Sequence, residues 1–393
     1  MRKDMLAFVK TLVSIRTENP PGLNYRECVE VIATQLHQFG LRPEIINVPH
    51  DARSFPRYCL LASLGNGPKT LYFHGHYDVV PASGRACFSP RVKRGLLYGR
   101  GASDMKGGLV AMIYAVRMLQ LLEVRLAGRV RLVFVPDEET GGARGTGYLF
   151  DKGYIGEDES AGMLMPEPTS GTVWNACRGA YSLLVKVKGK QVHVVLQHKG
   201  TNAFEQMLEL SNALLKFKDS VEKRKTGYSV AAGESKNSIL MLGGICKCGM
   251  SFNIVPGDCT FSIERRINPE ENFTTEKNRL IDLLKRFRKR GMNISTTVLQ
   301  EGESAGSSPD HYLGQSLAMS IRELHGRSPR FCMCPGLLEI RYYLKKGIPA
   351  YAYGPGLLSR AHHPDEYVRV QRIYDCASVY ALTALRLLGE GAG

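Results

Sequence analysis

The stretch TLYFHGHYDVVP, residues 70–81, begins as an apolar strand and ends in polar residues before the break at Pro81. His76 and Asp78 follow the apolar part, and residues two apart on an extended chain point to the same side. In open α/β sheets the binding crevice lies at the carboxyl ends of the strands. The stretch therefore predicts a buried strand of an α/β sheet with a polar site at its end.

Acids and histidines recur where other predicted segments end. RVRLVFVPDEE, from residue 129, ends at Glu138 and Glu139, and AGMLMPEPT, from residue 161, carries Glu167 near its end. GRGASDMKGG, from residue 99, places Asp104 among glycines before an apolar helix. The last segment, AHHPDE from residue 361, offers His362 after a turn-rich stretch. The glycine-rich loop could by itself be a phosphate cradle, but it lacks the spacing of a Walker or dinucleotide-binding loop.

Together these segments supply two imidazoles and at least three carboxylates, a set that suits two divalent ions with nitrogen and oxygen ligands. Zinc is the expected metal, with cobalt or manganese as alternatives. Glu138 and Glu139 are adjacent, which suggests that one is a ligand and the other a general base. Asp78 beside His76 would fix the tautomer of a ligating imidazole. Taken singly, each residue has a plainer explanation, because a strand-end aspartate is often a helix cap and paired glutamates are usually solvated.

The order of predicted elements indicates a domain inserted into another. Up to residue 178 strands and helices alternate, which is typical of a mainly parallel sheet covered on both faces. Residues 179–300 predict strand–helix–strand–strand–helix–strand, a ferredoxin-like α+β pattern. The first pattern returns after that segment. We therefore predict an α/β catalytic domain over 1–178 and 301–393, and an inserted dimerisation or lid domain over 179–300.

The composition narrows the functional classes. The 393 residues carry a net charge of +15, which fits an anionic substrate. The basic run at 285–290 follows apolar residues and predicts the solvent-exposed face of an amphipathic helix. No nucleic-acid-binding module is recognisable, so no nucleic-acid partner is expected. No apolar run approaches the roughly 20 residues of a membrane span, and the N-terminus predicts an amphipathic helix instead of a signal peptide. We expect a cytoplasmic protein whose dispersed cysteines are reduced and mostly buried.

Six motifs, HGHYDVVP, GRGASDMKGG, PDEETGG, PEPT, NIVPG and AHHPDE, occur in order along almost the whole chain. With them the sequence resembles the acetylornithine deacetylase and succinyl-diaminopimelate desuccinylase family of dimetal peptidases, which includes glutamate carboxypeptidases and aminoacylases. The resemblance implies a metal-dependent hydrolase that removes a succinyl or acetyl group from an N-acyl amino acid in amino-acid biosynthesis. The alternatives are a di- or carboxypeptidase or aminoacylase acting on a short peptide or related amide, and a catalytically inactive binding protein on this fold.

The resemblance also implies roles for single residues. His362 is preferred over His363 because the family's ligand stands four residues before the glutamate of the terminal motif, here Glu366. The implied positions are His76 and Glu167 on one metal, Glu139 and His362 on the other, Asp104 as the bridge, Glu138 as the general base, and Asp78 as the carboxylate that orients His76.

Residues of the predicted inserted domain complete the implied site. His193, with His198 as the competing choice, resembles a histidine that helps to hold the oxyanion, often from the partner subunit, so a homodimer is expected. Asn253 and Arg266 resemble residues that contact the substrate. Downstream, residues 336–339 depart from the family's hydroxyl-rich loop, although an acid–x–Arg pair remains and makes Arg341 a third candidate for substrate binding.

Overall fold

The computed structural model describes residues 1–50, 55–156 and 159–390. It divides into two compact units. The first comprises Met1–Asn175, Gly306–Cys332 and Leu338–Gly393, and the second comprises Ala176–Ala305 and Met333–Leu337. The predicted fold class is confirmed: a discontinuous α/β unit with a mostly parallel sheet, and a smaller unit with its own antiparallel sheet.

The large sheet gives the first unit its architecture. Its central strands β6, β3, β7 and β17 are parallel, whereas β1 and β2 pair antiparallel with their neighbours and β8 pairs antiparallel with β17. Parallel strands bring their carboxyl ends to one edge of the sheet, so residues that follow them gather there. The strands run in the order β1 (Glu44–Val48), β2 (Arg57–Leu64), β6 (Arg129–Val135), β3 (Thr70–His76), β7 (Ser160–Met165), β17 (Ala350–Ala352), β8 (Val173–Cys177) and β15 (Ala305–Gly306), with β16 (Phe331–Cys334) also paired to β8.

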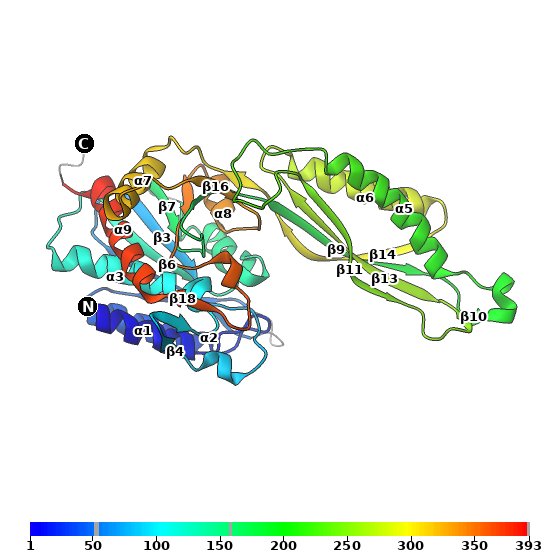
Figure 1. Ribbon diagram of the computed structural model, residues 1–393, viewed down its shortest axis with the longest axis horizontal. Helices are drawn as coiled ribbons and strands as arrows, with labels where there is room; N and C mark the ends of the chain where they lie inside the picture. The colour runs from blue at the N-terminus through cyan, green and yellow to red at the C-terminus, as the bar shows by residue number, and fades with distance from the viewer. Residues whose placement is uncertain (51–54, 157–158, 391–393) are drawn as a thin grey trace. The chain divides into compact units, whose positions relative to one another are not determined.

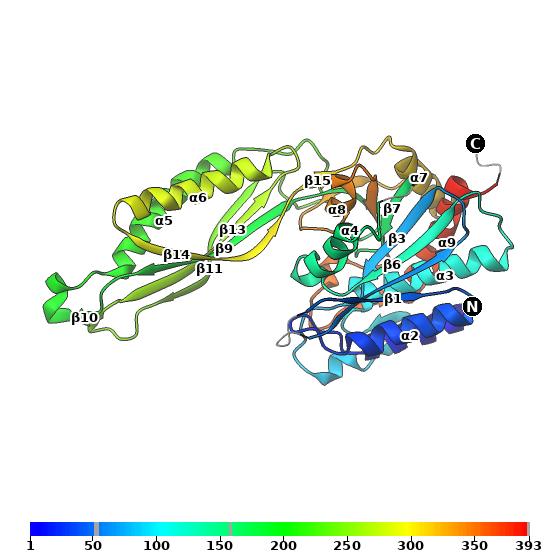
Figure 2. The same ribbon diagram turned by 180° about the vertical axis from the view of Figure 1, so that it is seen from behind.

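Helices cover both faces of this sheet (Figures 1 and 2). On β3, the Phe73 ring lies 5.6 Å from that of Tyr380 on α9, and the Tyr72 ring lies 5.5 Å from that of Tyr343 on α8. Because neighbouring side chains of a strand point to opposite faces, α9 and α8 lie on opposite sides. The helices are α1 (Arg2–Ser14), α2 (Tyr25–Gln38), α3 (Gly107–Leu121), α4 (Tyr148–Asp151), α7 (Tyr312–His325), α8 (Ile340–Lys345) and α9 (Val370–Leu388).

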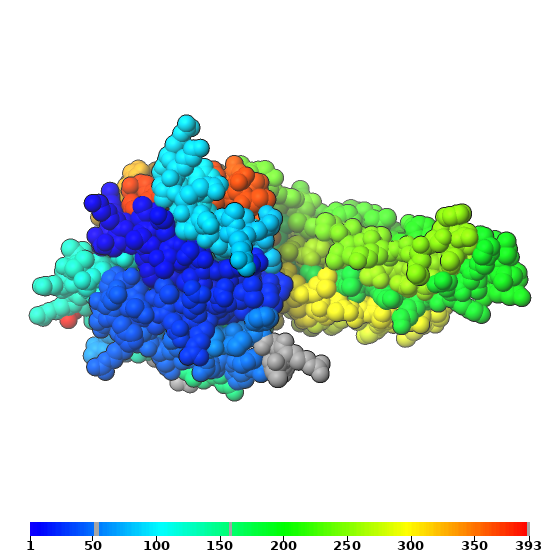
Figure 3. All heavy atoms as spheres, turned by 90° about the horizontal axis from the view of Figure 1, so that it is seen from below, coloured from blue at the N-terminus to red at the C-terminus, as the bar shows by residue number. Residues whose placement is uncertain are grey.

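The N-terminal helices are anchored next to the Asp104 loop. The Lys106 side chain is fully buried and its Nζ donates to the carbonyl oxygens of Leu12 and Ile15, where α1 ends. A cation at this position also satisfies carbonyls that the end of a helix leaves without partners. The segment with α1 and α2 forms part of the face of the first unit shown in blue in Figure 3.

A three-stranded sheet of the first unit joins two loops that are distant in sequence. β5 (Leu96–Tyr98) lies between β4 (Arg91–Lys93) and β18 (Tyr367–Arg369), and both pairings are antiparallel. Tyr98 pairs with Tyr367, so the chain leaving β5 toward Asp104 lies beside the chain entering β18 from His362.

The second unit has the predicted ferredoxin-like pattern. β9 (Gly179–Lys188), α5 (Ala203–Val221), β11 (Ile239–Cys248), β13 (Asp258–Ile267), α6 (Phe273–Lys289) and β14 (Asn293–Gly302) follow one another along the chain. The antiparallel sheet has the order β11-β13-β9-β14. Leu210 and Leu214 of α5 and Leu280 and Leu284 of α6 belong to the hydrophobic core that includes strand residues such as Ile263. The short strands β10 (Val192–His193) and β12 (Ile254–Val255) pair at one end of this unit (Figure 1).

The structure tests two expectations from the sequence, that the cysteines are reduced and that no helix spans a membrane. The expectation of reduced cysteines is wrong for Cys248 and Cys259, which form a disulfide. They lie directly opposite on β11 and β13, where cross-strand side chains are close neighbours. Among the described residues, no other cysteine takes part in a disulfide. Among the described helices, none combines the length and the apolar character needed to cross a bilayer.

Candidate metal centre

The candidate ligands gather at the carboxyl edge of the large sheet. His76 is the last residue of β3, Glu139 follows β6 closely, and Glu167 stands two residues after β7. Because β6, β3 and β7 are adjacent, their ends are close in space. The other two candidates come from loops: Asp104 precedes α3, and His362 precedes β18.

These five side chains form two groups that share Asp104. In one group, Nε2 of His76 lies 3.3 Å from Oδ1 of Asp104 and 3.8 Å from Oε1 of Glu167. In the other, Nε2 of His362 lies 3.2 Å from Oδ2 of Asp104 and 3.2 Å from Oε2 of Glu139. In each group the potential ligand atoms all lie within 4.8 Å of one another. Each oxygen of one carboxylate therefore faces a different imidazole, which is the arrangement that a bridging ligand requires.

The residues present fit a pair of divalent cations. Four of their buried atoms have no hydrogen-bond partner among the described residues: Nε2 of His76, Oδ1 of Asp104, Oε1 of Glu139 and Oε1 of Glu167. Buried polar atoms in native proteins are nearly always paired, and buried carboxylates are unfavourable without a compensating charge. Imidazole nitrogens and carboxylate oxygens are the donors that zinc and similar ions prefer. Two cations, one in each group, would satisfy all four atoms.

The electrostatics of the two groups also suit bound cations. Burial raises the pKa of Glu167 well above its usual range, and the charge of Asp104 adds to this effect. Burial also raises the pKa of Glu139, although contact with His362 opposes the change. For Asp104, burial alone would raise the pKa, but the close contacts with the imidazoles of His362 and His76 outweigh it and lower the pKa. Contacts with Asp104 and Glu139 raise the pKa of His362 to about 11. The cluster therefore concentrates negative charge, which the two imidazoles partly offset.

Asp78 connects the first group to the turn that carries the two glutamates. Nδ1 of His76 lies 3.0 Å from the carbonyl oxygen of Asp78 and 3.2 Å from its Oδ1, so a proton on Nδ1 leaves Nε2 free for a ligand role. The Asp78 carboxylate also accepts from the backbone amides of Glu138 and Glu139, both at 3.2 Å. The Asn19 amide donates to the same carboxylate at 2.8 Å. One buried carboxylate thus orients both an imidazole and the glutamate turn.

Glu138 belongs to neither group of potential ligands but lies beside them. Its side chain is partly exposed, in contrast to Asp78, which is fully buried. Burial raises the pKa of Glu138 well above its usual range, His76 opposes this, and the charges of Glu167 and Glu139 add to it. A carboxylate with a raised pKa is suited to taking up a proton and releasing it again.

Arg341 lies on α8 of the first unit, and its side chain forms hydrogen bonds within the protein. Its guanidinium donates to the carbonyl oxygens of Leu338 at 2.8 Å and Gly141 at 2.5 Å. The neighbouring Glu339 is fully buried, 2.8 Å from Nε2 of His74, and accepts from the Thr146 hydroxyl at 2.6 Å. This acid–x–Arg pair therefore bonds within the protein, and the role of Arg341 in substrate binding stays a prediction without support from these contacts.

The remaining predicted site residues belong to the second unit. His193 lies on β10, and Asn253 precedes β12, which pairs with β10. The backbone amide of Val194 donates to the carbonyl oxygen of Asn253 at 2.9 Å, so the two candidates are close neighbours. Arg266 lies near the opposite end of β13 and forms an ion pair with Glu264 at 2.6 Å. Within this unit the structure brings His193 and Asn253 together and leaves Arg266 apart.

Sequence reasoning assigned no role to two residues that contact the centre. Asn19 bonds to Asp78, and Arg100 donates to the carbonyl oxygens of His362 and His363. Arg100 was visible as part of GRGASDMKGG, but its partners lie more than 260 positions away in the sequence. No local pattern could have identified the contact.

Comparisons with known proteins identify the family and fold of this chain. Residues 72–386 match the sequence model described as peptidase family M20/M25/M40. A Staphylococcus epidermidis protein named probable succinyl-diaminopimelate desuccinylase is 28% identical over 404 residues, with 96% of each chain covered. A Pasteurella multocida acetylornithine deacetylase is 28% identical over 358 residues, covering 88% of this chain and 87% of the relative. A Sulfolobus solfataricus M20 family metallo-carboxypeptidase shares the fold, with a TM-score of 0.81, 18% identity and coverage of 97% and 98%.

Proposed function

This chain belongs to peptidase family M20/M25/M40 and is a hydrolase of that family, and we propose that it is a two-metal deacylase acting on N-acyl amino acids. The acyl group we propose is succinyl or acetyl. One observation carries the two-metal part of the proposal: the two oxygens of Asp104 face His76 and His362 separately. The names of the two relatives above support the choice of deacylation.

In the proposed mechanism, divalent ions would supply Lewis acidity, which activates water at neutral pH and polarises the scissile carbonyl. His76 and Glu167 would hold one ion, Glu139 and His362 the other, and Asp104 both. Glu138 acts as the general base, taking a proton from the attacking water at its carboxylate and delivering it to the leaving amine. The Asp78 carboxylate holds the backbone of Glu138 in place while this proton moves.

The proposed substrate is a small anionic N-acyl amino acid. The net charge of +15 favours the approach of anions, although it does not select one. The carboxypeptidase likeness keeps a second candidate open, namely cleavage of a short peptide. Both reactions hydrolyse an amide and need the same metal centre and base, so the substrate alone separates them.

A substrate panel tests the proposal. The purified chain is loaded with zinc, cobalt or manganese, its metal content is measured, and N-succinyl amino acids, N-acetyl amino acids and dipeptides are compared. We expect kcat/KM for an N-acyl amino acid to exceed that for any dipeptide by at least about tenfold, a difference of about 1.4 kcal/mol. The reverse order would support the peptidase alternative. A chain with two metals that hydrolyses no amide would refute the proposed function.

We also propose that the protein is a homodimer formed through the second unit. Large apolar side chains are exposed on α5 and on the edge strand β14, including Leu208, Leu215, Val298 and Leu299, which are 45–52% exposed. Exposed apolar surface of this kind is typical of protein interfaces. Light scattering at working concentration should give twice the monomer mass. A strict monomer would refute the dimer and with it any role of His193 in a partner's site.

A further inference from the structure

A buried ion pair lies behind the second group of potential ligands, Asp104, Glu139 and His362. Nη1 of Arg100 lies 2.6 Å from Oε2 of Glu366. Arg100 is 5% exposed and Glu366 is 2% exposed, so the pair is shielded from solvent. Burying two charges is unfavourable unless their geometry is good and further hydrogen bonds satisfy them. Arg100 and Glu366 therefore each need further hydrogen bonds, and both make them to loops of the metal centre.

Glu366 bonds to the loop that carries the bridging carboxylate. Its Oε1 accepts from the backbone amides of Ser103 at 2.9 Å and Asp104 at 3.0 Å. Its own carbonyl oxygen accepts from the amide of Gly99 at 3.1 Å. Glu366 therefore fixes the backbone of Asp104 on one side and the start of the same loop on the other.

Arg100 bonds to the loop that carries the second imidazole. Its guanidinium donates to the carbonyl oxygens of His362 at 3.2 Å and His363 at 3.3 Å. His362 has a φ of 62°, in the left-handed region that residues with a side chain seldom adopt. Two charge-assisted hydrogen bonds to consecutive carbonyls stabilise this backbone conformation. Because His362 is half exposed, its placement depends on such contacts more than that of His76, which ends a buried strand.

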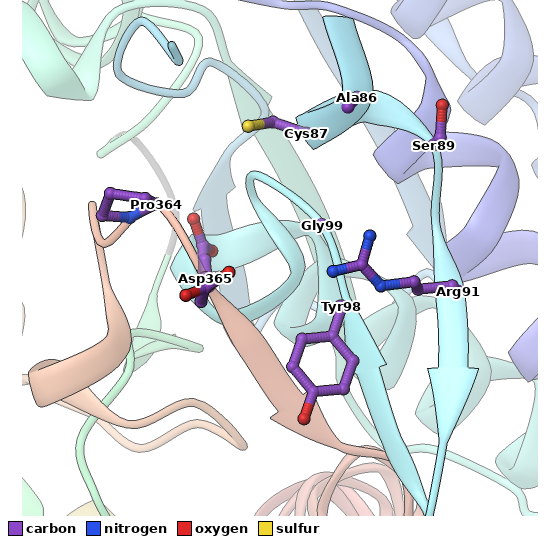
Figure 4. Close-up of a pocket in the computed structure, with 9 residues that line it drawn as sticks. Ala86, Cys87, Ser89, Arg91, Tyr98, Gly99, Pro364 and Asp365 are labelled. Atoms are coloured by element: carbon purple, nitrogen blue, oxygen red, sulfur yellow. The ribbon is translucent and has the colours of Figure 1, made fainter. Parts of the chain in front are cut away.

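The two partners meet because of the small sheet. Pairing of Tyr98 on β5 with Tyr367 on β18 brings Gly99 and Glu366 side by side. On the solvent side, a pocket of about 150 Å³ is lined by Cys87, Gly99, Asp365 and Glu366, among others (Figure 4). Figure 4 shows that residues of this pocket lie on β5, on β4 and in the loop before β18.

We propose that Arg100 and Glu366 are positioning residues that set the affinity of the second metal ion. The pair holds Asp104 and His362 in register, and through them the group completed by Glu139. The first group is anchored differently, by the end of β3 and by Asp78. This inference rests on the proposed two-metal function, because it assigns the pair to one of the two sites.

Zinc titration of the metal-free protein tests the proposal. In Glu366→Gln the side chain keeps an oxygen for the amides of Ser103 and Asp104 but loses its charge toward Arg100. In Arg100→Lys a single ammonium replaces the forked guanidinium. We expect each variant to bind one zinc ion with an affinity within about twofold of the wild type, and a second about 10–100-fold more weakly, as residues that support metal ligands typically cause.

Combined variants identify which site has weakened. Adding His362→Ala to Glu366→Gln should change zinc binding little, since the second site is already weak. Adding His76→Ala should remove the remaining tight site. If Glu366→Gln weakens both sites equally, or neither, with native circular dichroism, the proposal is refuted. If Glu366→Gln does not fold, Arg100→Lys decides by the same criterion.

A matched control separates positioning from general destabilisation. Glu276, in the second unit, is 3% exposed and pairs with Arg224 at 2.6 Å and Arg265 at 3.1 Å. Glu276→Gln should lower stability but leave both zinc affinities unchanged. Wild-type protein that binds fewer than two zinc ions would refute the two-metal function itself. Two tight sites in the wild type that persist in both Glu366→Gln and Arg100→Lys would refute only the role of Arg100 and Glu366.

Discussion

At the scale of single residues, the centre assigns different tasks to chemically identical side chains. Glu139 points its carboxylate at His362, whereas its neighbour Glu138 lies beside both groups and belongs to neither. Both backbone amides bond to the same carboxylate of Asp78. Two adjacent glutamates fixed in this way can serve as a ligand and as a base without competing for one ion.

This division predicts the behaviour of Glu138→Gln. The amide cannot accept a proton, so kcat should fall by about 10²–10⁴-fold, the usual contribution of a general base. Zinc content should stay at the wild-type level, because Glu138 is not among the potential ligands. Steady-state kinetics and metal analysis of the same preparation measure both. Glu30→Gln, on the surface of α2, serves as the control and should retain full activity. Unchanged turnover in Glu138→Gln would remove Glu138 from the mechanism.

At the scale of elements, α8 holds the loop that follows the glutamate turn. Arg341 and Tyr342 both donate to the carbonyl oxygen of Gly141, and Glu339 bonds to Thr146 in the same loop. Glu339 also pairs with His74 on β3, so the helix, the loop and the central sheet form one network. A network of buried polar groups is rigid when all its members are satisfied.

The network predicts a structural role for Arg341 that differs from substrate binding. Arg341→Met should lower the free energy of unfolding by about 2 kcal/mol, because the carbonyl of Gly141 loses a charge-assisted donor. It should reduce kcat more than it raises KM. Thermal unfolding and steady-state kinetics measure these effects, with Arg26→Met on the surface of α2 as the control. A large rise in KM with unchanged stability would instead support the substrate contact predicted from the sequence.

The second unit contains its own buried charge cluster around Glu276. Burial would raise the pKa of Glu276, but Arg224 and Arg265 outweigh it and lower the pKa below the ordinary value of 4.5. The carboxylate therefore contributes stability that is present above pH 4.5 and is lost as pH falls through its lowered folded-state pKa.

The stability difference between Glu276→Gln and the wild type should depend on pH in this way. At pH 7, Glu276→Gln should destabilise the second unit by about 2 kcal/mol, because Arg265 and Arg224 lose one of their two carboxylate partners and keep only Glu271. The difference from the wild type should shrink as pH drops below 4.5. Urea unfolding at several pH values measures it. Glu209→Gln, which breaks an exposed pair with Arg290, should cost at most about 1 kcal/mol. A pH-independent difference would contradict the assigned electrostatic cause.

At the scale of the whole molecule, function is divided unequally between the two units. In the part of the chain that the structure describes, both groups of potential metal ligands belong to the first unit. The second unit carries His193 and Asn253 near its β10–β12 end. Metal binding should therefore stabilise the first unit, while the second unit has its own core and ion pairs.

Removal of metal tests this division. Zinc at 100 times its dissociation constant should stabilise the protein by about 2.7 kcal/mol for each site, because it binds the folded form selectively. Chelation should reverse the gain, and thermal unfolding with and without zinc measures it. His37→Ala, at an exposed position of α2, should respond as the wild type does, whereas His76→Ala should lose about half of the response, the part that comes from its own site. Equal responses in the two variants would exclude His76 as a ligand.

The sequence by itself determined the fold class and the residue types of the centre. Strand periodicity and acids at strand ends are local features, so they can be read from short segments such as residues 70–81 and 129–139. Parallel strands then place those ends together without further information. For this reason the local sequence predicts that His76, Glu139 and Glu167 lie close together.

Only the tertiary structure decided which side chains support the centre and which do not. The contacts of Arg100 with His362 and of Glu366 with Asp104 join loops more than 260 residues apart. The contact between Glu339 and His74 of β3 likewise joins residues that are 265 positions apart in the sequence. Arg341 shows the opposite case, since its motif suggested a ligand contact while its guanidinium bonds to backbone carbonyls. Long-range pairing depends on strand order and register, which a local sequence pattern does not encode.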